Sequence, residues 1–425
     1  PISKAAVDAD PSLERDTMVG ATGIEASNNV FIAGTSGERW LMVSAVGRQL
    51  GVVSEIKPQP GHDLGTTLDI ELQEVAARAL GDRAGAVVAL DPRSGAVRVM
   101  YSAPSFNPDV FGGRLSRKDW LALQEDPLHP LQNRCLQGVY PPGSTIKPFL
   151  ALAGLAEGAI DPGTTVFCNG SVVLYGHLFR CWRRGGHGFV KLERALAESC
   201  DVYFYQLGRR LGIESMAPWL HRFGFGERTG LDLKFENSGL IGTPEWSRRV
   251  RGTPWYPGEA ISVSIGQGPV LATVLQLARG FAALANGGRL ISPHLVTQPS
   301  GDRVEPMVNQ DRLALVTSAL EQVVHGPAGT ARRMARLPMA GKTGTAQVAR
   351  LQDGVDSDDL APHLRHHAWF VGWAPLDQPE LVVSVIVEHG GDGGSAAAPV
   401  AGAVIEAYLG QQSSAGLPLE PDGVL

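Results

Sequence analysis

A serine and a lysine lie three residues apart in the stretch PPGSTIKPFLALAGLA, where Ser144 and Lys147 follow two prolines and a glycine. The prolines and glycine before Ser144 and the apolar run after it predict that Ser144 lies in the first turn of a helix. Residues i and i+3 share a helix face, so the Lys147 amine can reach the Ser144 hydroxyl. A helix N-terminus favours the neutral amine as base and stabilises an oxyanion at the serine, which activates a nucleophile. Taken alone, the pair is more often an N-capping serine beside a solvated lysine.

Two further stretches favour chemistry over capping. AESCDVYFYQLG places Ser199 and Asp201 two residues apart. The second stretch is a predicted strand, MAGKTGTAQV, with Lys342, Thr343, Gly344 and Thr345. Its basic side chain and two hydroxyls suit an extended peptide that ends in a carboxylate and binds by strand addition, and its glycine lets another backbone approach. Ser-x-x-Lys, Ser-x-Asp/Asn and Lys-Thr-Gly, in this order, form the pattern of penicillin-recognising acyl transferases.

Potential metal ligands gather in the segment that leads to Ser199. Three thiolates and an imidazole can form a closed, tetrahedral zinc site, although the spacing here is not that of a C-x-x-C knuckle. The competing interpretation is a disulfide between Cys168 and Cys181, with Cys200 a buried thiol. We favour structural zinc, and the acyl-transfer chemistry itself needs no cofactor. The four residues are Cys168, Cys181, His187 and Cys200, whereas Cys135 is predicted to be a buried hydrophobe.

The composition excludes several classes of protein. The chain has 425 residues, is 44% hydrophobic and carries a formal net charge of -6. No run of lysine and arginine stands out, so nucleic acid is not an expected partner. The longest apolar run, residues 381–387, falls far short of the ~20 residues that span a bilayer.

Hydrophobic periodicity predicts the elements that position these residues. DIELQEVAARALGD reads as a helix, and AGAVVALDPRSGAVRVMYS reads as a hairpin in which Pro92 and Gly95 supply the turn angles. Farther on, helical stretches surround a few strands such as AWFVGWAP, which predicts an α+β fold with a mostly antiparallel sheet flanked by helices. We divide the chain into a partial N-terminal domain with its linker (1–61), a catalytic domain (62–412) and a flexible tail (413–425).

The chain resembles the class B penicillin-binding proteins, and among them the penicillin-binding protein 2 group of cell-elongation enzymes. The resemblance runs from about residue 16 to 409 and includes GATGIEASNN, PLQNRCLQGVYPPGSTIKPF, SIGQGPVLATVLQLARGFAALANGG, AGKTGTAQV and HHAWFVGWAP. It implies a transpeptidase domain of the penicillin-binding-protein and serine β-lactamase fold, preceded by part of a pedestal (dimerisation-type) domain. It also implies an N-terminal membrane helix, which this sequence lacks, and a place at the periplasmic face of the bacterial inner membrane.

The resemblance implies a role for each motif residue. Ser144 is the nucleophile that a D-Ala-D-Ala stem peptide acylates, and Lys147 takes its proton. Ser199 relays protons to the leaving amine and from the incoming amine. Asp201 stands where asparagine is common in the wider superfamily, and we predict that it is ionised.

The same resemblance assigns the binding groups. Lys342, Thr343 and Thr345 hold the substrate carboxylate, and the backbone N–H groups of Ser144 and Thr345 form the oxyanion hole. Some members of the penicillin-binding protein 2 group hold zinc with two aspartates, a histidine and a cysteine. His187 and Cys200 match directly, while Cys168 and Cys181 take the two aspartate positions.

The implied function is that of a peptidoglycan D,D-transpeptidase, which cross-links stem peptides during elongation and is covalently inhibited by β-lactams. A D,D-carboxypeptidase or β-lactamase would need a base for water, and no separate Glu motif supplies one. A non-catalytic β-lactam sensor or scaffold is the third interpretation, and the complete motif set argues against it. The implied partners are stem peptides, β-lactams, a SEDS-family glycosyltransferase, the rod-shape complex and the membrane.

Overall fold

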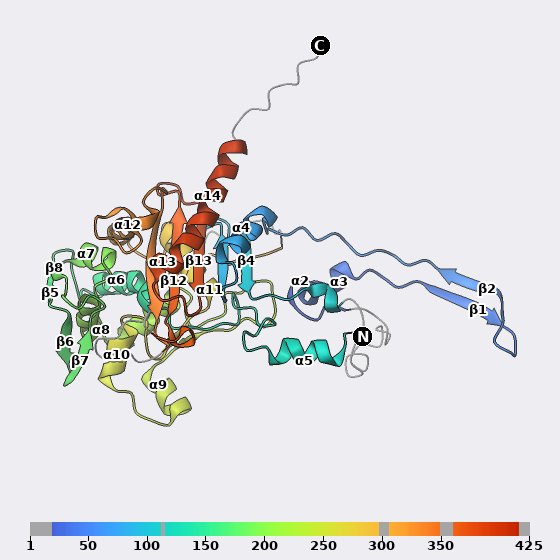
Figure 1. Cartoon of the computed structure of the whole chain (residues 1–425), viewed down its shortest axis with the longest axis horizontal. Helices are drawn as coiled ribbons and strands as arrows, with labels where there is room; N and C mark the ends of the chain where they lie inside the picture. The colour runs from blue at the N-terminus through green and yellow to red at the C-terminus, as the bar shows by residue number, and fades with distance from the viewer. Residues whose placement is uncertain (1–18, 112–114, 297–305, 349–359, 416–425) are drawn as a thin grey trace, which may run out of the picture.

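A five-stranded antiparallel sheet forms the centre of the molecule (Figure 1). The computed structural model describes residues 19–111, 115–296, 306–348 and 360–415. Every neighbouring pair of strands in this sheet is antiparallel. The predicted α+β class is therefore confirmed. In spatial order the strands are β11 (Ala340–Ala346), β12 (His367–Ala374), β13 (Leu381–Val387), β3 (Gly85–Leu90) and β4 (Val97–Ala103).

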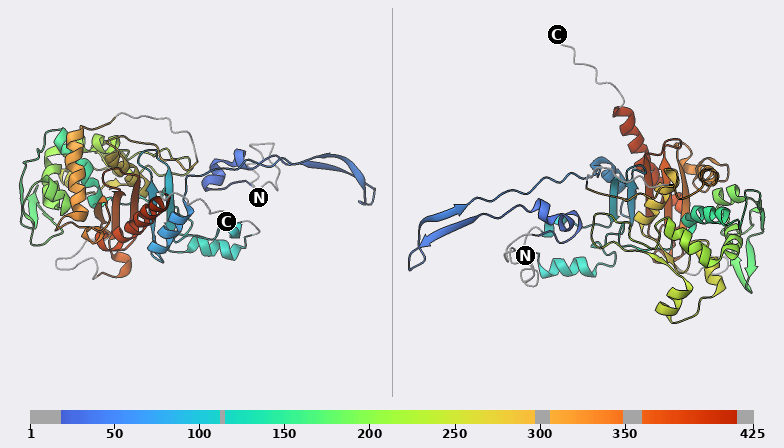
Figure 2. Two further views of the ribbon diagram at one scale, coloured as in Figure 1. Left: turned by 90° about the horizontal axis from the view of Figure 1, so that it is seen from above. Right: turned by 180° about the vertical axis from the view of Figure 1, so that it is seen from behind.

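Helices cover both faces of the sheet. On one face, α4 (Ile70–Leu80) packs beside the long C-terminal helix α14 (Ala398–Ala415), and on the other lies α11 (Val274–Ala285) (Figures 1 and 2). The continuous apolar run of β13 is fully buried, as expected for a strand covered on both faces. The predicted helix over DIELQEVAARALGD is confirmed as α4, which Asp69 caps and Gly81 ends.

A mostly helical lobe lies beside β11 and contributes the other half of the core. Its centre is a cluster of rings, in which Phe149 on α6 contacts Phe223, Phe225 and Phe281. All four rings are buried. The main helices are α6 (Lys147–Ala156), α7 (Leu192–Ala197), α8 (Asp201–Arg222), α10 (Pro257–Val263) and α12 (Gln310–His325).

Two small hairpin-like sheets edge this lobe, and short elements complete the fold. The pairs are β5 (Val166–Cys168) with β8 (Gly188–Val190), and β6 (Ser171–Leu174) with β7 (His177–Arg180). The others are α5 (Arg117–Glu125), β9 (Leu240–Ile241), α9 (Pro244–Trp246), β10 (Val270–Leu271), α13 (Gly393–Ala396) and the single turns η1 (Pro108–Phe111), η2 (Gly143–Ile146), η3 (Ser247–Arg251), η4 (Arg332–Met334) and η6 (Pro362–Leu364).

The N-terminal part projects away from this body. A hairpin of β1 (Glu38–Val43) and β2 (Gln49–Ile56) lies far from the sheet, and all of its strand residues are exposed (Figure 2). The region predicted as small strands and loops also contains two short helices, α2 (Gly23–Ser27) and α3 (Asn29–Ile32). A hairpin with no covered face has no core of its own, and the division into a partial N-terminal domain and its linker stays a prediction.

The C-terminal boundary differs slightly from the prediction. Helix α14 continues to Ala415, three residues into the segment predicted as a tail. Gln411 Nε2 donates to Glu71 Oε2 on α4 at 3.0 Å, so the last turns still have a partner. Residues 416–425 lie outside the described part. Among the described helices, none combines the length and apolarity that crossing a bilayer requires.

Candidate active site

The turn that carries Ser144 is held against the edge strand of the sheet. Ser144 lies in η2, which leads directly into α6, so the predicted first-turn position is confirmed. Gly143 has φ +56° and donates its N–H to Gly266 O at 2.9 Å. A Cβ at Gly143 would lie 2.4 Å from Thr345 O and 2.9 Å from Thr345 N, so only glycine fits. The start of η2 thus packs directly against the backbone of Thr345, and the shared oxyanion hole stays a prediction.

The Lys147 amine connects the first motif with the second. The side chain is fully buried. Its Nζ donates to Ser199 O at 3.0 Å, to Ser199 Oγ at 3.2 Å and to Asp201 Oδ1 at 2.7 Å. The Ser144 hydroxyl is not among its hydrogen-bond partners in the described residues, so that contact stays a prediction. Catalytic hydrogen bonds often tighten only when substrate binds.

The loop between α7 and α8 presents Ser199 to this amine in an unusual conformation. Ser199 has φ +56°, a region that residues other than glycine seldom adopt. This backbone lets both its carbonyl and its hydroxyl meet one amine. Asp201 follows as the first residue of α8 and accepts a second hydrogen bond from Trp182 N at 2.9 Å. Burial raises the pKa of the Asp201 carboxyl above its ordinary value, although the Lys147 ammonium acts to lower it. That Asp201 is ionised therefore stays a prediction.

The third motif lies on β11, the edge strand of the sheet. Lys342 is fully buried, and burial, followed by the nearby Lys147 charge, holds its pKa well below the ordinary value. Its Nζ donates to Thr343 O at 3.1 Å. A Cβ at Gly344 would lie 2.9 Å from Thr145 Cγ2 and 3.0 Å from Pro142 O, so the absent side chain lets η2, the turn that carries Ser144, approach β11.

Two residues of this region were not predicted as functional. Thr330 Oγ1 lies 2.6 Å from Thr343 Oγ1. Gln267 Nε2 donates to Thr345 O at 2.8 Å and fixes the end of the strand. Neither belongs to a motif, because each meets β11 through a contact between segments that are distant in sequence.

Cys168, Cys181, His187 and Cys200 come together in one buried cluster. Their potential ligand atoms all lie within 4.8 Å of one another, and all three cysteines are free. His187 Nδ1 lies 3.6 Å from Cys168 Sγ and 3.5 Å from Cys181 Sγ. With Zn–S bonds of about 2.3 Å and Zn–N bonds of about 2.0 Å, such pairs in a tetrahedral site lie about 3.5 Å apart.

The surroundings of this cluster favour a thiolate ligand but leave the second nitrogen of His187 without a hydrogen-bond partner among the described residues. A hydrogen bond from Cys200 holds the pKa of the Cys181 thiol below its ordinary value, and so favours a thiolate. If Nδ1 is the ligand, Nε2 carries the proton, and this buried atom has no hydrogen-bond partner among the described residues. The donor set and spacing nevertheless fit zinc, and Cys200 ties the cluster to the residues on either side of it, Ser199 and Asp201.

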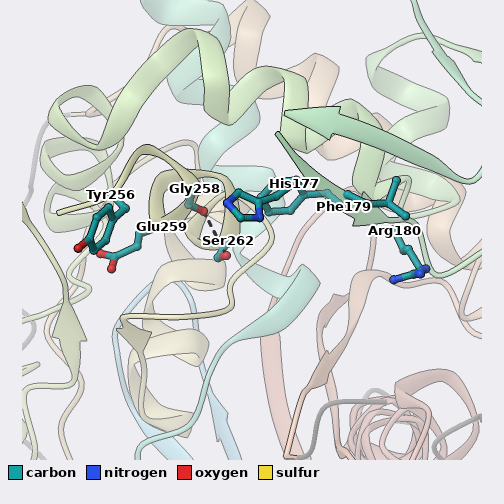
Figure 3. Close-up of a pocket in the computed structure, with 8 residues that line it drawn as sticks. His177, Phe179, Arg180, Tyr256, Gly258, Glu259 and Ser262 are labelled. Atoms are coloured by element: carbon teal, nitrogen blue, oxygen red, sulfur yellow. Dashed lines mark hydrogen bonds between the residues drawn. The ribbon is translucent and has the colours of Figure 1, made fainter. Parts of the chain in front are cut away.

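A recess lies on the surface next to the segment that carries Cys181. Its volume is about 470 Å³, and it opens between β7 and the start of α10 (Figure 3). Two of its lining residues are linked to the site. Arg180 directly precedes Cys181 of the cysteine cluster, and Ser262 O accepts from the N–H of Gln267, the residue that contacts β11, at 3.0 Å. The motif residues themselves are not among those that line it. The lining residues are His177, Leu178, Phe179, Arg180, Tyr256, Gly258, Glu259 and Ser262.

Two family models match the chain. One describes the penicillin-binding protein transpeptidase domain and matches residues 85–406, and the other describes the penicillin-binding protein dimerisation domain and matches residues 2–66. Among curated proteins, the peptidoglycan D,D-transpeptidase MrdA of Acinetobacter baumannii is 40% identical over 395 residues. The match covers 89% of this chain and 59% of that protein, so the chain spans about three fifths of the relative's length.

Solved structures give the same result. Pseudomonas aeruginosa PBP2, in complex with WCK 5153, has a TM-score of 0.80 and 40% identity, covering 92% of this chain and 84% of that chain. Helicobacter pylori PBP2, in complex with MreC, has a TM-score of 0.85 and 30% identity, covering 98% and 76%. A peptidoglycan synthase complex that coordinates polymerization and crosslinking contains a chain with a TM-score of 0.80 and 35% identity, covering 98% and 74%. This chain therefore belongs to the penicillin-binding protein family and carries its transpeptidase domain.

Proposed function

We propose that the protein is a peptidoglycan D,D-transpeptidase of cell elongation. The observation that carries the proposal is the buried Lys147 amine, which bridges Ser199 and Asp201 one helical turn from Ser144. A buried amine in this position can take a hydroxyl proton and pass it on, which a capping serine and a solvated lysine would not require. The relatives' shared name supports the same activity.

The proposed reaction proceeds in two acyl transfers. Ser144 Oγ attacks the carbonyl of the penultimate D-alanine while Lys147 takes its proton, and the Ser144 and Thr345 N–H groups stabilise the oxyanion. Ser199 passes a proton to the departing D-alanine amine, leaving an ester on Ser144. The amine of a second stem peptide then attacks this ester, its proton returns through Ser199 and Lys147, and Ser144 is released as the hydroxyl.

Until the D-alanine departs, the terminal carboxylate of the donor needs a fixed partner. Side chains alternate along a strand, so Thr343 and Thr345 project from one face of β11 and Lys342 from the other. β11 also offers its backbone to an extended peptide. A β-lactam, whose carboxylate follows a strained amide, would enter as a substitute for the donor and stop at the acyl-enzyme.

A donor peptide ending in D-Ala-D-Ala, incubated with an amine acceptor, tests the activity. We expect D-alanine release together with a donor–acceptor product, and neither from Ser144→Ala. Hydrolysed donor as the main product, even at high acceptor concentration, would instead support the carboxypeptidase interpretation. Acylation by neither peptide nor β-lactam in the folded protein would support the sensor or scaffold.

The proposed setting follows from the relatives. A related PBP2 in complex with MreC and a related chain within a peptidoglycan synthase complex support partners in the cell-wall synthesis machinery. We propose that these partners include the rod-shape complex and a SEDS-family glycosyltransferase. We propose that the protein works at the periplasmic face of the inner membrane. Co-purification of the membrane-anchored full-length protein with such a glycosyltransferase tests this setting, and a full-length protein that fractionates with the cytosol would contradict it.

We further propose that the cysteine cluster binds structural zinc. Cys168, Cys181, His187 and Cys200 would hold the ion, which would supply no reactive group and would fix the loop around Ser199. Elemental analysis of the purified protein should find about one zinc per chain. Cys181→Ser should lose it, and Cys135→Ser, outside the cluster, should keep it. Fewer than three free thiols in denatured, unreduced and chelated protein would rule zinc out and support the disulfide.

A further inference from the structure

A pair of threonine hydroxyls joins the carboxylate-binding strand to a loop that no motif includes. Thr330 Oγ1 and Thr343 Oγ1 lie 2.6 Å apart, and either can be the donor. Thr343 is buried on β11. Thr330 lies between α12 and η4, at the end of the stretch HGPAGT. A contact this short requires a proton between the two oxygens.

The backbone of Thr330 is fixed by three elements. Its N–H points to Ala197 O on α7 at 3.4 Å, and the next residue, Ala331, donates to Val323 O on α12 at 2.9 Å. Its own carbonyl faces α13 so closely that a Cβ at Gly394 would lie 2.3 Å from it. The Thr330 hydroxyl is therefore presented to Thr343 by packing rather than by a mobile loop.

We propose that Thr330 is a positioning residue that determines specificity for substrates with a free terminal carboxylate. A hydroxyl has one proton to donate. If Thr343 gives its proton to a bound carboxylate, the 2.6 Å contact can be kept only when Thr330 donates to Thr343. Thr330 thus directs the Thr343 proton toward the substrate. The inference rests on the proposed function, which makes Thr343 a substrate-binding group.

The expected contribution depends on the charge of the ligand. A hydrogen bond to a carboxylate is roughly twice as strong as one between neutral groups. Hydrogen bonds in a chain also polarise one another, so a donor behind Thr343 strengthens the bond in front of it. A neutral ester in place of the carboxylate gains much less from this chain. Thr330 should therefore matter for acids and hardly for their esters.

The test compares acylation by benzylpenicillin with acylation by its methyl ester, each as a second-order rate constant from intact mass. Thr330→Val keeps the shape and removes the hydroxyl, and we expect it to lower the acid-to-ester ratio about tenfold. Thr330→Ser keeps the hydroxyl and should restore the ratio. Thr317→Val is the matched control, because the Thr317 hydroxyl donates within α12, to Ala314 O at 3.1 Å, and makes no hydrogen bond to β11 in the described part of the chain.

Three further outcomes separate the explanations. The single variant Thr343→Val should lower the acid-to-ester ratio, and the double variant Thr343→Val with Thr330→Val should lower it no further. Equal loss of both rates in Thr330→Val, with an unchanged ratio, would mean a structural role only and would overturn the inference. If Thr330→Val fails to fold, Thr330→Ala carries the same expectation. A folded wild type that forms no adduct refutes the proposed function itself, whereas an unchanged ratio refutes only the role of Thr330.

Discussion

Replacing Glu388 with glutamine removes the carboxylate that faces the buried Arg134 guanidinium, close to the turn that carries Ser144. Arg134 is 2% exposed, and its Nε and Nη2 donate to Glu388 Oε1 at 3.0 Å and Oε2 at 3.3 Å. Glu388 Oε1 also accepts from the Tyr140 hydroxyl at 2.6 Å. Tyr140 lies four residues before Ser144, and its ring meets Trp369, which in turn donates to Pro141 O. The ion pair therefore anchors the segment that enters the active site.

The magnitude follows from the burial of the pair. Breaking a buried ion pair by removing one partner costs about 3–5 kcal/mol, because the remaining charge stays desolvated. Whole domains are stable by only about 5–15 kcal/mol. Glu388→Gln keeps the shape and one acceptor for Tyr140, so we place it near the lower limit. Arg134→Met should cost a similar amount, but the double variant should cost far less than the sum of the two.

Equilibrium urea unfolding of the four proteins of this double-mutant cycle measures the coupling. An exposed pair, Arg336 with Glu406 on α14, is the matched control, and Glu406→Gln should cost no more than about 1 kcal/mol. If the losses in Arg134→Met and Glu388→Gln simply add, the two groups do not act as an ion pair and the reasoning fails.

The same pair predicts a pH dependence. Burial acts to raise the pKa of Glu388, but the hydrogen bonds from Arg134 and Tyr140 outweigh it and hold the pKa below the ordinary value. The stabilisation is therefore complete above the unfolded pKa of about 4.3 and is lost as the pH falls through the lower folded pKa. The wild type should lose stability over this acidic range more steeply than Glu388→Gln. Parallel curves would contradict the assignment.

Three other substitutions or reactions have defined outcomes. Gly143→Ala should slow acylation by benzylpenicillin at least about tenfold, because the new Cβ meets the β11 backbone. Gly158→Ala is the control, because Gly158 also has a positive φ, +69°, but open space where the Cβ would lie. This variant carries the backbone strain without the clash and should leave acylation intact. Cys135 should resist iodoacetamide in the native protein, since burial raises the pKa of its thiol to about 12, and labelling at pH 8 before unfolding would contradict this. Asp201→Asn should lower the thermal midpoint and slow acylation. The Asp201 carboxylate accepts from both the buried Lys147 amine and the Trp182 N–H, whereas an amide has only one acceptor oxygen. Unchanged acylation would show that the charge is unimportant.

Local patterns were sufficient for much of the fold and of the site. Helix α4, the β3–β4 hairpin and the helical start at Ser144 each follow from periodicity and turn residues within a short window. The three motifs likewise predicted that Ser144, Ser199 and Lys342 would meet, and Lys147 does bridge the first two motifs. The extent of α14 was underestimated, because its last turns are retained by α4, far away in sequence.

The remaining features depend on contacts that a sequence does not display. The left-handed backbone of Ser199 has no signal in its residue type, since the conformation is imposed by the surrounding packing. Thr330 and Gln267 reach β11 from separate loops, and no spacing rule connects them to Lys-Thr-Gly. The pairing of Arg134 with Glu388, 254 positions apart, could be read only from the folded chain.

The central claim is that Ser144 is the nucleophile of an acyl-transfer site, and intact mass after incubation with benzylpenicillin tests it most directly. We expect one long-lived adduct per chain in the wild type and none in Ser144→Ala, with both proteins equally folded. An adduct that persists in Ser144→Ala, or a folded wild type that forms none while the drug stays intact, would contradict the account.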